Sequence, residues 1–159
     1  MLGLALGVGA IGSVLGAVVS ARIGRRIGIG RAWIVGLVVF PGATILVPLT
    51  GPDLPMPAIL ALLFVMEFAS GFGVMILDIV GGSIKTALIP DRLRARVAGA
   101  YMVVNYGVRP LGALAGGALG TWIGLRPTLW IATVGAIAGV LWLLPSPILR
   151  MRELPEADE

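Results

Sequence analysis

Three ionisable residues stand within otherwise apolar stretches of this sequence: Glu67, Asp78 and Arg109. Charged groups at membrane depth are costly, and those that persist usually face a protein interior or a water-filled cavity. Glu67 lies ten residues after Pro57, and Arg109 thirteen residues after Arg96. In helices these spacings place them ~15 and ~20 Å from opposite faces of a bilayer ~30 Å thick, so their levels differ by about 5 Å. An arginine side chain covers that distance, so the sequence predicts that Glu67 and Arg109 pair.

This pair has two interpretations, and the sequence leaves both open. In the functional one, Glu67 and Arg109 line a transport path, and Glu67 is a proton-coupling carboxylate. In the structural one, the two residues form an ion pair that fixes the register of neighbouring helices. Pro110 directly follows Arg109, and it frees a backbone carbonyl in the preceding turn and lets the helix bend there.

Two further polar residues belong with this pair. Asp78 comes eleven residues after Glu67, and eleven steps of about 100° return to nearly the same helix face. Its place near the cytosolic end suggests pairing with a loop arginine at an inner gate, or simply a solvated helix end. Asn105 lies one turn before Arg109 and is placed to hydrogen-bond either a substrate or a neighbouring helix.

The composition points to a membrane protein. Residues are 58% hydrophobic and 13% charged, with a mean hydropathy of +1.02, and the segments 1–21, 32–52 and 127–149 contain no charge. Each segment is as long as the roughly 20 residues that cross a bilayer. The chain has no cysteine and no histidine, which removes thiol chemistry and the commonest metal ligands. We expect no metal site, no cofactor and, because the basic residues flank helices, no nucleic-acid partner.

Ten of the twelve basic residues fall in three clusters separated by pairs of apolar stretches. The clusters are Arg22, Arg25, Arg26 and Arg31; Lys85, Arg92, Arg94 and Arg96; and Arg150 and Arg152. Because short cytosolic loops of membrane proteins carry an excess of Lys and Arg, all three clusters are expected on the cytosolic side. The prediction is an all-α bundle of five spans within residues 1–149, followed by a charged cytosolic tail at 150–159. The spans are about 2–20, 32–50, 58–80, 97–119 and 128–144, and Pro41 and Pro48 interrupt the second. A basic loop at 22–31 and a longer cytosolic segment at 81–96 are expected between the spans.

An odd number of spans puts the N-terminus outside and the C-terminus in the cytosol of a plasma (inner) membrane. A complete six-helix half of a transporter would have both termini in the cytosol, so we expect the chain to begin one helix short. Met1 is then a misassigned start, a gene break or the edge of a fragment.

Three motifs in this order resemble the major facilitator superfamily of transporters. Arg-Ile-Gly-Arg-Arg at 22–26 is similar to the core of that family's cytosolic loop signature, and Ile-Pro-Asp-Arg-Leu-Arg-Ala-Arg-Val at 89–97 resembles its segment between helices 10 and 11. Pro-Leu-Gly-Ala-Leu-Ala-Gly-Gly at 110–117 resembles helix 11 of exporters related to enterobactin and macrolide efflux proteins. The sequence departs from the family pattern at Ala21, where an acidic residue is usual, and at Ala95, where glycine is usual.

The resemblance implies a partial facilitator fold that corresponds to helices 8 to 12. It also implies that the residues of the two cytosolic motifs help to latch the inward face; these are Arg22, Gly24, Arg25, Arg26, Asp91, Arg92, Arg94 and Arg96. The alternative is that the arginines only set the topology and contact anionic lipid, at about 1 kcal/mol each.

Two functions remain open. The first is a secondary active transporter, an exporter of small organic molecules with proton coupling as one option, whose partners are the bilayer, its substrate and a missing N-terminal half. The second is a non-transporting helical membrane module that assembles with a complementary subunit or is a truncated remnant. An enzyme is not expected, because one carboxylate at the midplane makes no protease site and hydrolase motifs are absent.

Overall fold

The computed structural model describes residues 2–50 and 54–141, and all regular structure in these ranges is helical. The helices are α1 (Leu2–Ile27), α2 (Ile29–Ala43), α3 (Leu46–Leu49), α4 (Met56–Leu88), α5 (Asp91–Trp122) and α6 (Leu125–Leu141). The all-α prediction is confirmed. The predicted tail at 150–159 and the last residues of the fifth span, 142–144, lie outside the described residues.

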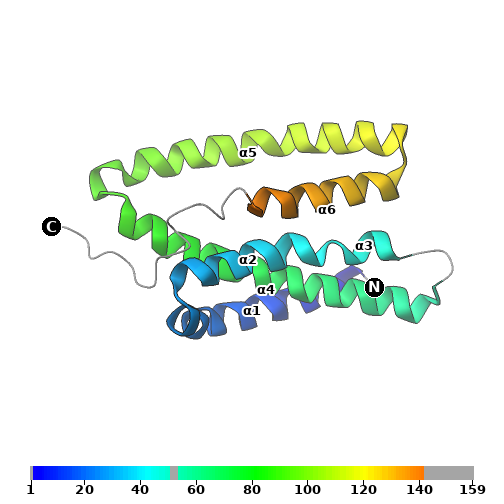
Figure 1. Ribbon diagram of the computed structural model, residues 1–159, viewed down its shortest axis with the longest axis horizontal. Coiled ribbons are helices and arrows are strands. Elements are labelled where there is room, and N and C mark those ends of the chain that lie inside the picture. The colour runs from blue at the N-terminus through cyan, green and yellow to red at the C-terminus, as the bar shows by residue number, and fades with distance from the viewer. Residues whose placement is uncertain (1, 51–53, 142–159) are drawn as a thin grey trace.

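Helices α1, α2 and α4 form one closely packed unit, with α4 against both of the others. Helix α6 lies along α2 and α3, and α5 forms the outermost layer on the far side of α6 (Figure 1). No residue of α5 is buried. The described part of the chain is therefore a tight three-helix unit with a loosely attached α5–α6 hairpin.

Glycines allow the close contact between α1 and α4. A Cβ atom on Gly12 would overlap the Phe68 carbonyl oxygen, and one on Gly16 would lie 2.6 Å from the Phe72 carbonyl oxygen. Gly71 on α4 faces the carbonyl oxygen of Gly9 just as closely. Without side chains at these positions the two backbones come together, which is how helices gain packing energy in lipid.

The buried core lies where α1, α2 and α4 meet near the α1–α2 turn. Its fully buried members are Ala32 and Ile76, and Val80 and Ile84 continue the same face of α4. Trp33 packs on this core at Gly81, where an added Cβ would lie 2.8 Å from the indole nitrogen. Small residues on one helix and β-branched residues on the other fill the contact.

The second predicted span is interrupted, as its two prolines suggest. The break falls at Thr44 and Ile45, between α2 with its internal Pro41 and the short α3. Pro48 cannot donate to the carbonyl of Thr44, and the Val47 amide donates to it instead at 3.1 Å. The Thr44 hydroxyl also lies 3.2 Å from the Thr133 hydroxyl of α6, so the break is joined to the neighbouring helix.

The basic loop predicted at 22–31 and the longer connecting segment predicted at 81–96 are mostly helical. Helix α1 runs through the first arginines to Ile27, and Gly28 alone, with φ 89°, turns the chain into α2. Only glycine adopts that backbone conformation without strain. Helix α4 likewise continues to Leu88, and Ile89 and Pro90 separate it from α5. Arginine and lysine are good helix formers, so a basic cluster marks the side of a membrane without ending the helix.

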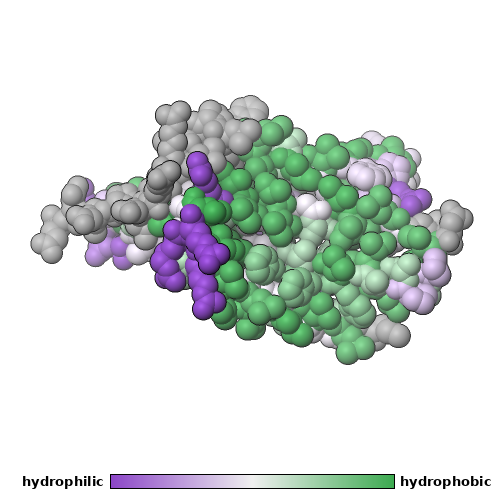
Figure 2. All heavy atoms as spheres, turned by 60° about the horizontal axis from the view of Figure 1, so that its bottom comes forward, coloured by the Kyte–Doolittle hydropathy of each residue, from purple (hydrophilic) through white to green (hydrophobic). Residues whose placement is uncertain are grey.

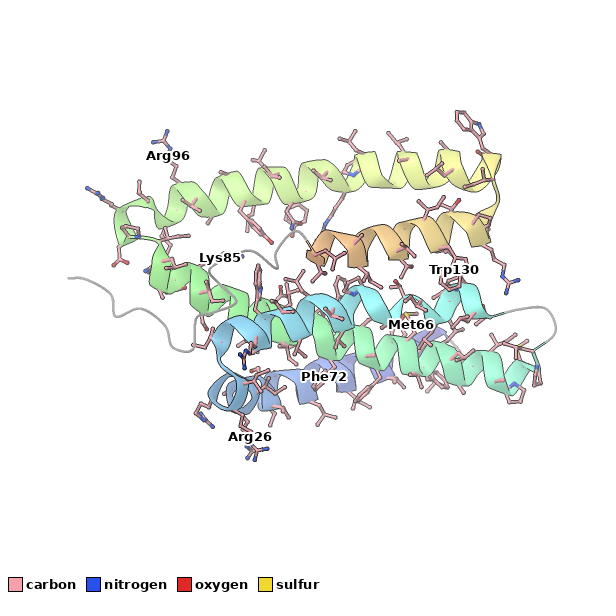
Figure 3. All side chains as sticks on the ribbon, viewed as in Figure 1. Arg26, Met66, Phe72, Lys85, Arg96 and Trp130 are labelled. Carbon is pink, nitrogen blue, oxygen red and sulfur yellow. The ribbon has the colours of Figure 1, made fainter. Side chains whose placement is uncertain are left out.

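The ends of the bundle differ in charge. Arg26 and Arg96, from the first two basic clusters, lie at the same end of the molecule (Figure 3). At the opposite end Arg126 donates to the carbonyl oxygen of Thr50 at 3.1 Å, which holds the start of α6 beside the end of α3. By length and composition, residues 3–27, 29–49 and 56–88 can cross a membrane. The crossings predicted for 97–119 and 128–144 remain predictions.

Candidate functional site

A groove of about 380 Å³ lies between the C-terminal half of α4 and the first half of α5. It brings together three of the four polar residues that the sequence placed on a transport path, because Asp78 lines it from α4 and both Asn105 and Arg109 line it from α5. Arg109 follows Asn105 by four residues and therefore lies on the same face of α5.

Two tyrosines organise the polar side chains of this groove. The ammonium of Lys85 lies 4.0 Å from the centre of the Tyr101 ring, and the amide nitrogen of Asn105 donates to the Tyr101 hydroxyl at 3.3 Å. The Arg109 guanidinium lies 4.7 Å from the centre of the Tyr106 ring. Aromatic faces attract cations, so both basic side chains are held by ring contacts. Lys85 extends from the part of α4 that is nearest to the start of α5 (Figure 3).

Glu67 does not belong to this groove, and its predicted pairing with Arg109 is not formed. A Cβ atom on Gly9 of α1 would lie 3.0 Å from the Glu67 carboxylate oxygen, so this side chain lies at the α1–α4 contact. Ser13 completes that polar spot by donating toward the carbonyl oxygens of Gly9 and Gly71, at 3.1 and 3.2 Å. The predicted pairing used only the depth of Glu67 and Arg109 in the membrane. It did not include the direction in which each side chain leaves its helix.

The motif at 89–97 is held together locally. Arg94 and Asp91 form an ion pair at 2.6 Å, and Arg94 also donates to the carbonyl oxygen of Thr86 at 3.2 Å. The pair is three residues apart on α5 and its side chains are 47% and 89% exposed, so it adds little stability. It is the one ion pair among residues 2–50 and 54–141. The motifs at 22–26 and 89–97 are therefore not joined by a charge pair within the described chain, and Asp78 has no arginine ion-pair partner there.

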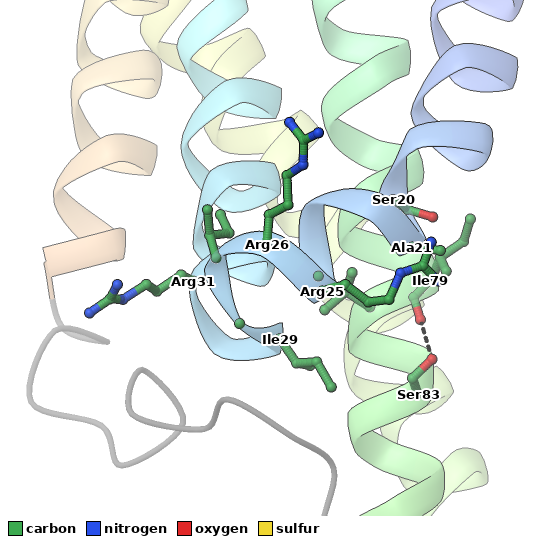
Figure 4. A pocket seen from close by; sticks show the side chains of 12 residues that line it. Ser20, Ala21, Arg25, Arg26, Ile29, Arg31, Ile79 and Ser83 are labelled. Carbon is green, nitrogen blue, oxygen red and sulfur yellow. Dashed lines mark hydrogen bonds between the residues drawn. The ribbon is translucent and has the colours of Figure 1, made fainter.

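The first motif surrounds a second and larger hollow, of about 710 Å³, at the α1–α2 turn (Figure 4). We call it the basic hollow; its lining residues are Ser20, Ala21, 24–29, Arg31, Ile79, Val80 and Ser83. Arg25 extends toward the Ile79 side and Arg31 toward the opposite side of the turn (Figure 4). Arg22 is exposed and lies outside this lining.

The comparisons with known proteins give one match. The sequence model of the Major Facilitator Superfamily matches residues 1–159. The chain belongs to this superfamily. No curated protein and no solved structure matches the chain. Membership of this superfamily places the chain in a class of membrane transporters.

Sequence reasoning did not assign to the groove the three side chains whose cation–ring contacts and hydrogen bond organise it: Lys85, Tyr101 and Tyr106. A signal for two of them was present, because Tyr101, Asn105 and Arg109 recur at intervals of four and Tyr106 adjoins them on the same side of a helix. Lys85 was assigned only to a cytosolic cluster. The distance from Lys85 to Tyr101 depends on how α4 and α5 fold back on each other. The spacing of residues along one helix does not predict that arrangement. Across the described ranges, no three acidic residues gather as a metal site would require.

Proposed function

We propose that this facilitator chain is the part of a secondary active transporter that carries the rear helices of the fold, and that the α4–α5 groove lies on its transport path. The observation that carries the proposal is the meeting of Asp78, Asn105 and Arg109 in one groove within a chain that the superfamily matches throughout. Polar residues at membrane depth usually face such a path.

Within the groove, Asp78 and Arg109 supply opposite charges from two helices, and Asn105 supplies an amide beside them. A small organic molecule that exchanges contacts with these groups as α4 and α5 separate would be carried without being chemically changed. For the coupling of transport to protons, the geometry favours Asp78 over Glu67, because Asp78 lines the groove and Glu67 lies against Gly9 of α1.

The direction and setting of transport belong to the same proposal. The motifs at 22–26, 89–97 and 110–117 favour correspondence to helices 8 to 12 and an exporter of the enterobactin and macrolide efflux type. The basic end of the bundle then faces the cytosol of an inner membrane, with the N-terminus outside and the C-terminus inside. The partner that completes the path is the N-terminal half of the fold.

The test uses a bacterial strain deficient in efflux that expresses the complete transporter gene carrying this chain. Accumulation of a panel of fluorescent organic compounds is measured for the wild type and for Asp78→Asn and Arg109→Gln. We expect both variants to accumulate compounds that the wild type exports. Thr121→Ala is the control, because Thr121 is exposed near the other end of α5 and its hydroxyl bonds only to its own helix at Ala118. Export that survives both groove substitutions would refute the path.

A non-transporting module that assembles with other helices remains the second candidate, and one observation favours it. Gly112, Gly116 and Gly120 have nothing within 4 Å of an added Cβ, and Val103 and Leu114 on the same helix are 75% and 72% exposed. A surface of this kind suits contact with a further helix. The DNA upstream of the Met1 codon separates the candidates: an open frame with seven more apolar spans favours the transporter, and a genuine start signal favours the module.

A further inference from the structure

The walls of the α4–α5 groove carry more positive than negative charge. Within the described part of the chain, the charged residues that line it are Asp78, Lys85, Arg94 and Arg109. Arg94 is already engaged in an ion pair with Asp91. Among the described residues, no carboxylate lies within ion-pair distance of Lys85 or Arg109. Two cations therefore stand against one carboxylate, and concave sites with an excess of one sign of charge attract ligands of the opposite sign.

Lys85 is the cation best placed to meet the negative charge of a ligand. It lies in the last turn of α4, seven residues after Asp78, which is about 10 Å along the helix. A negative charge in contact with Lys85 is therefore attracted by the ammonium much more strongly than it is repelled by the Asp78 carboxylate. An ammonium has three N–H donors, and the ring contact with Tyr101 leaves donors for a carboxylate oxygen.

The groove beside Lys85 suits an aromatic or apolar body. Val97, Tyr101, Met102 and Tyr106 line it from α5, and all four side chains are exposed. Tyrosine rings and the methionine side chain offer apolar area to a flat ring. The bundle that carries the groove presents a broad hydrophobic surface that ends in a group of strongly hydrophilic side chains (Figure 2). Lipid around this bundle has a low dielectric constant, which strengthens the attraction between an ammonium and an anion.

We propose that the groove selects organic anions, and that Lys85 binds the charged group of an aromatic carboxylate whose ring lies against the α5 wall of the groove. This selectivity rests on the proposed function, since it defines the class of compound that the transport path accepts. A neutral compound of the same shape would leave the Lys85 ammonium without an anionic partner. An organic cation would be repelled by both Lys85 and Arg109.

The test measures binding to the complete transporter, purified in detergent, by fluorescence anisotropy. The probes are naphthoate, anthracene carboxylate and coumarin carboxylate, each compared with its own primary amide, which keeps the ring and loses the charge. We expect the wild type to bind at least one acid roughly tenfold more tightly than its amide, the scale of a hydrogen bond between charged groups. Lys85→Gln should bring that acid and its amide to similar affinities, whereas Lys85→Arg should keep the preference.

The matched control is Arg92→Gln, which also removes one positive charge. Arg92 is exposed in the first turn of α5 and does not line the groove, so we expect the control to keep the wild-type preference. Lys85 is exposed as well, and its substitution should leave the protein folded, which circular dichroism checks for every variant.

The anion selectivity and the transport path fail in different ways. The selectivity would be overturned if no acid bound the wild type more tightly than its amide, if the preference survived Lys85→Gln, or if Lys85→Gln and Arg92→Gln lost it equally. The transport path would fail if export of the preferred acid persisted in both Asp78→Asn and Arg109→Gln. In that case the preference for the acid at Lys85 would remain measurable by binding.

Discussion

The ammonium of Lys85 lies 4.0 Å from the centre of the Tyr101 ring and connects α4 to α5 across the groove. Lys85 is in the last turn of α4, and Tyr101 lies ten residues into α5. The same tyrosine accepts a hydrogen bond from Asn105 at its hydroxyl. Tyr101 therefore links Lys85 at one end of the groove to Asn105 further along it.

This contact predicts a measurable coupling between the two side chains. In a double-mutant cycle with Lys85→Gln and Tyr101→Leu, we expect a coupling free energy of unfolding of about 0.5–1 kcal/mol, the range of exposed cation–π pairs. Thermal unfolding of the full chain in detergent measures it. Tyr101→Phe keeps the ring and loses only the hydroxyl, so it should retain the coupling with Lys85. Additive effects of the Lys85 and Tyr101 substitutions would mean that the ring contact contributes nothing.

The close contact of α1 with α4 predicts opposite effects for the same substitution at two glycines. Gly71→Ala places a methyl group against the Gly9 carbonyl and 2.9 Å from the Ser13 hydroxyl oxygen, and such overpacking costs about 1–3 kcal/mol. Gly116→Ala meets nothing within 4 Å and should stabilise α5 by about 0.5–1 kcal/mol.

Both glycine variants are compared with the wild type by thermal unfolding of the chain on its own in detergent. A Gly71→Ala protein as stable as the wild type would show that α1 and α4 do not approach each other at Gly9. Val or Ile at position 71 should cost more than Ala, because the added atoms extend further into the α1 backbone.

The separate environments of the two carboxylates of α4 predict separate effects on transport. In the complete transporter, Asp78→Asn should lower the rate of export roughly tenfold or more, the scale of one lost hydrogen bond to a charged group. Glu67→Gln keeps the shape of a side chain that packs on Gly9, so its export and its dependence on the proton gradient should stay near the wild-type values. Export assays with and without a proton ionophore measure both quantities. Loss of gradient dependence in Glu67→Gln alone would reverse the assignment of the coupling role.

Hydropathy predicted the all-helical fold, because burial in lipid imposes length and composition on each span. The break between α2 and α3 also followed from Pro41 and Pro48. The ends of the helices were not predicted, since the arginines near Gly28 and the lysine at position 85 support a helix as readily as a loop.

The contacts between helices were harder to predict than the positions of residues along each helix. The glycine pairs Gly3–Gly7 and Gly12–Gly16 look equivalent in the sequence, yet only Gly12 and Gly16 contact α4, while Gly3 and Gly7 face open space. Glu67 and Asp78 share a face of α4 by spacing, but that face meets α1 at the level of Glu67 and the α5 groove at the level of Asp78. The rotation and crossing of the helices decide these contacts, and a single sequence does not contain them.

The modest apolarity of α5 has a consequence for how the protein is made. Helices α1, α2 with α3, and α4 each carry enough apolar length to leave the translocation machinery for lipid one by one, whereas α5 is not among the segments that can. Its neighbour α6 is apolar over its described residues, Leu125–Leu141. Gly124, with φ 91°, folds the two against each other. We therefore expect α5 and α6 to enter the bilayer together as a hairpin, after the three-helix unit is already in place.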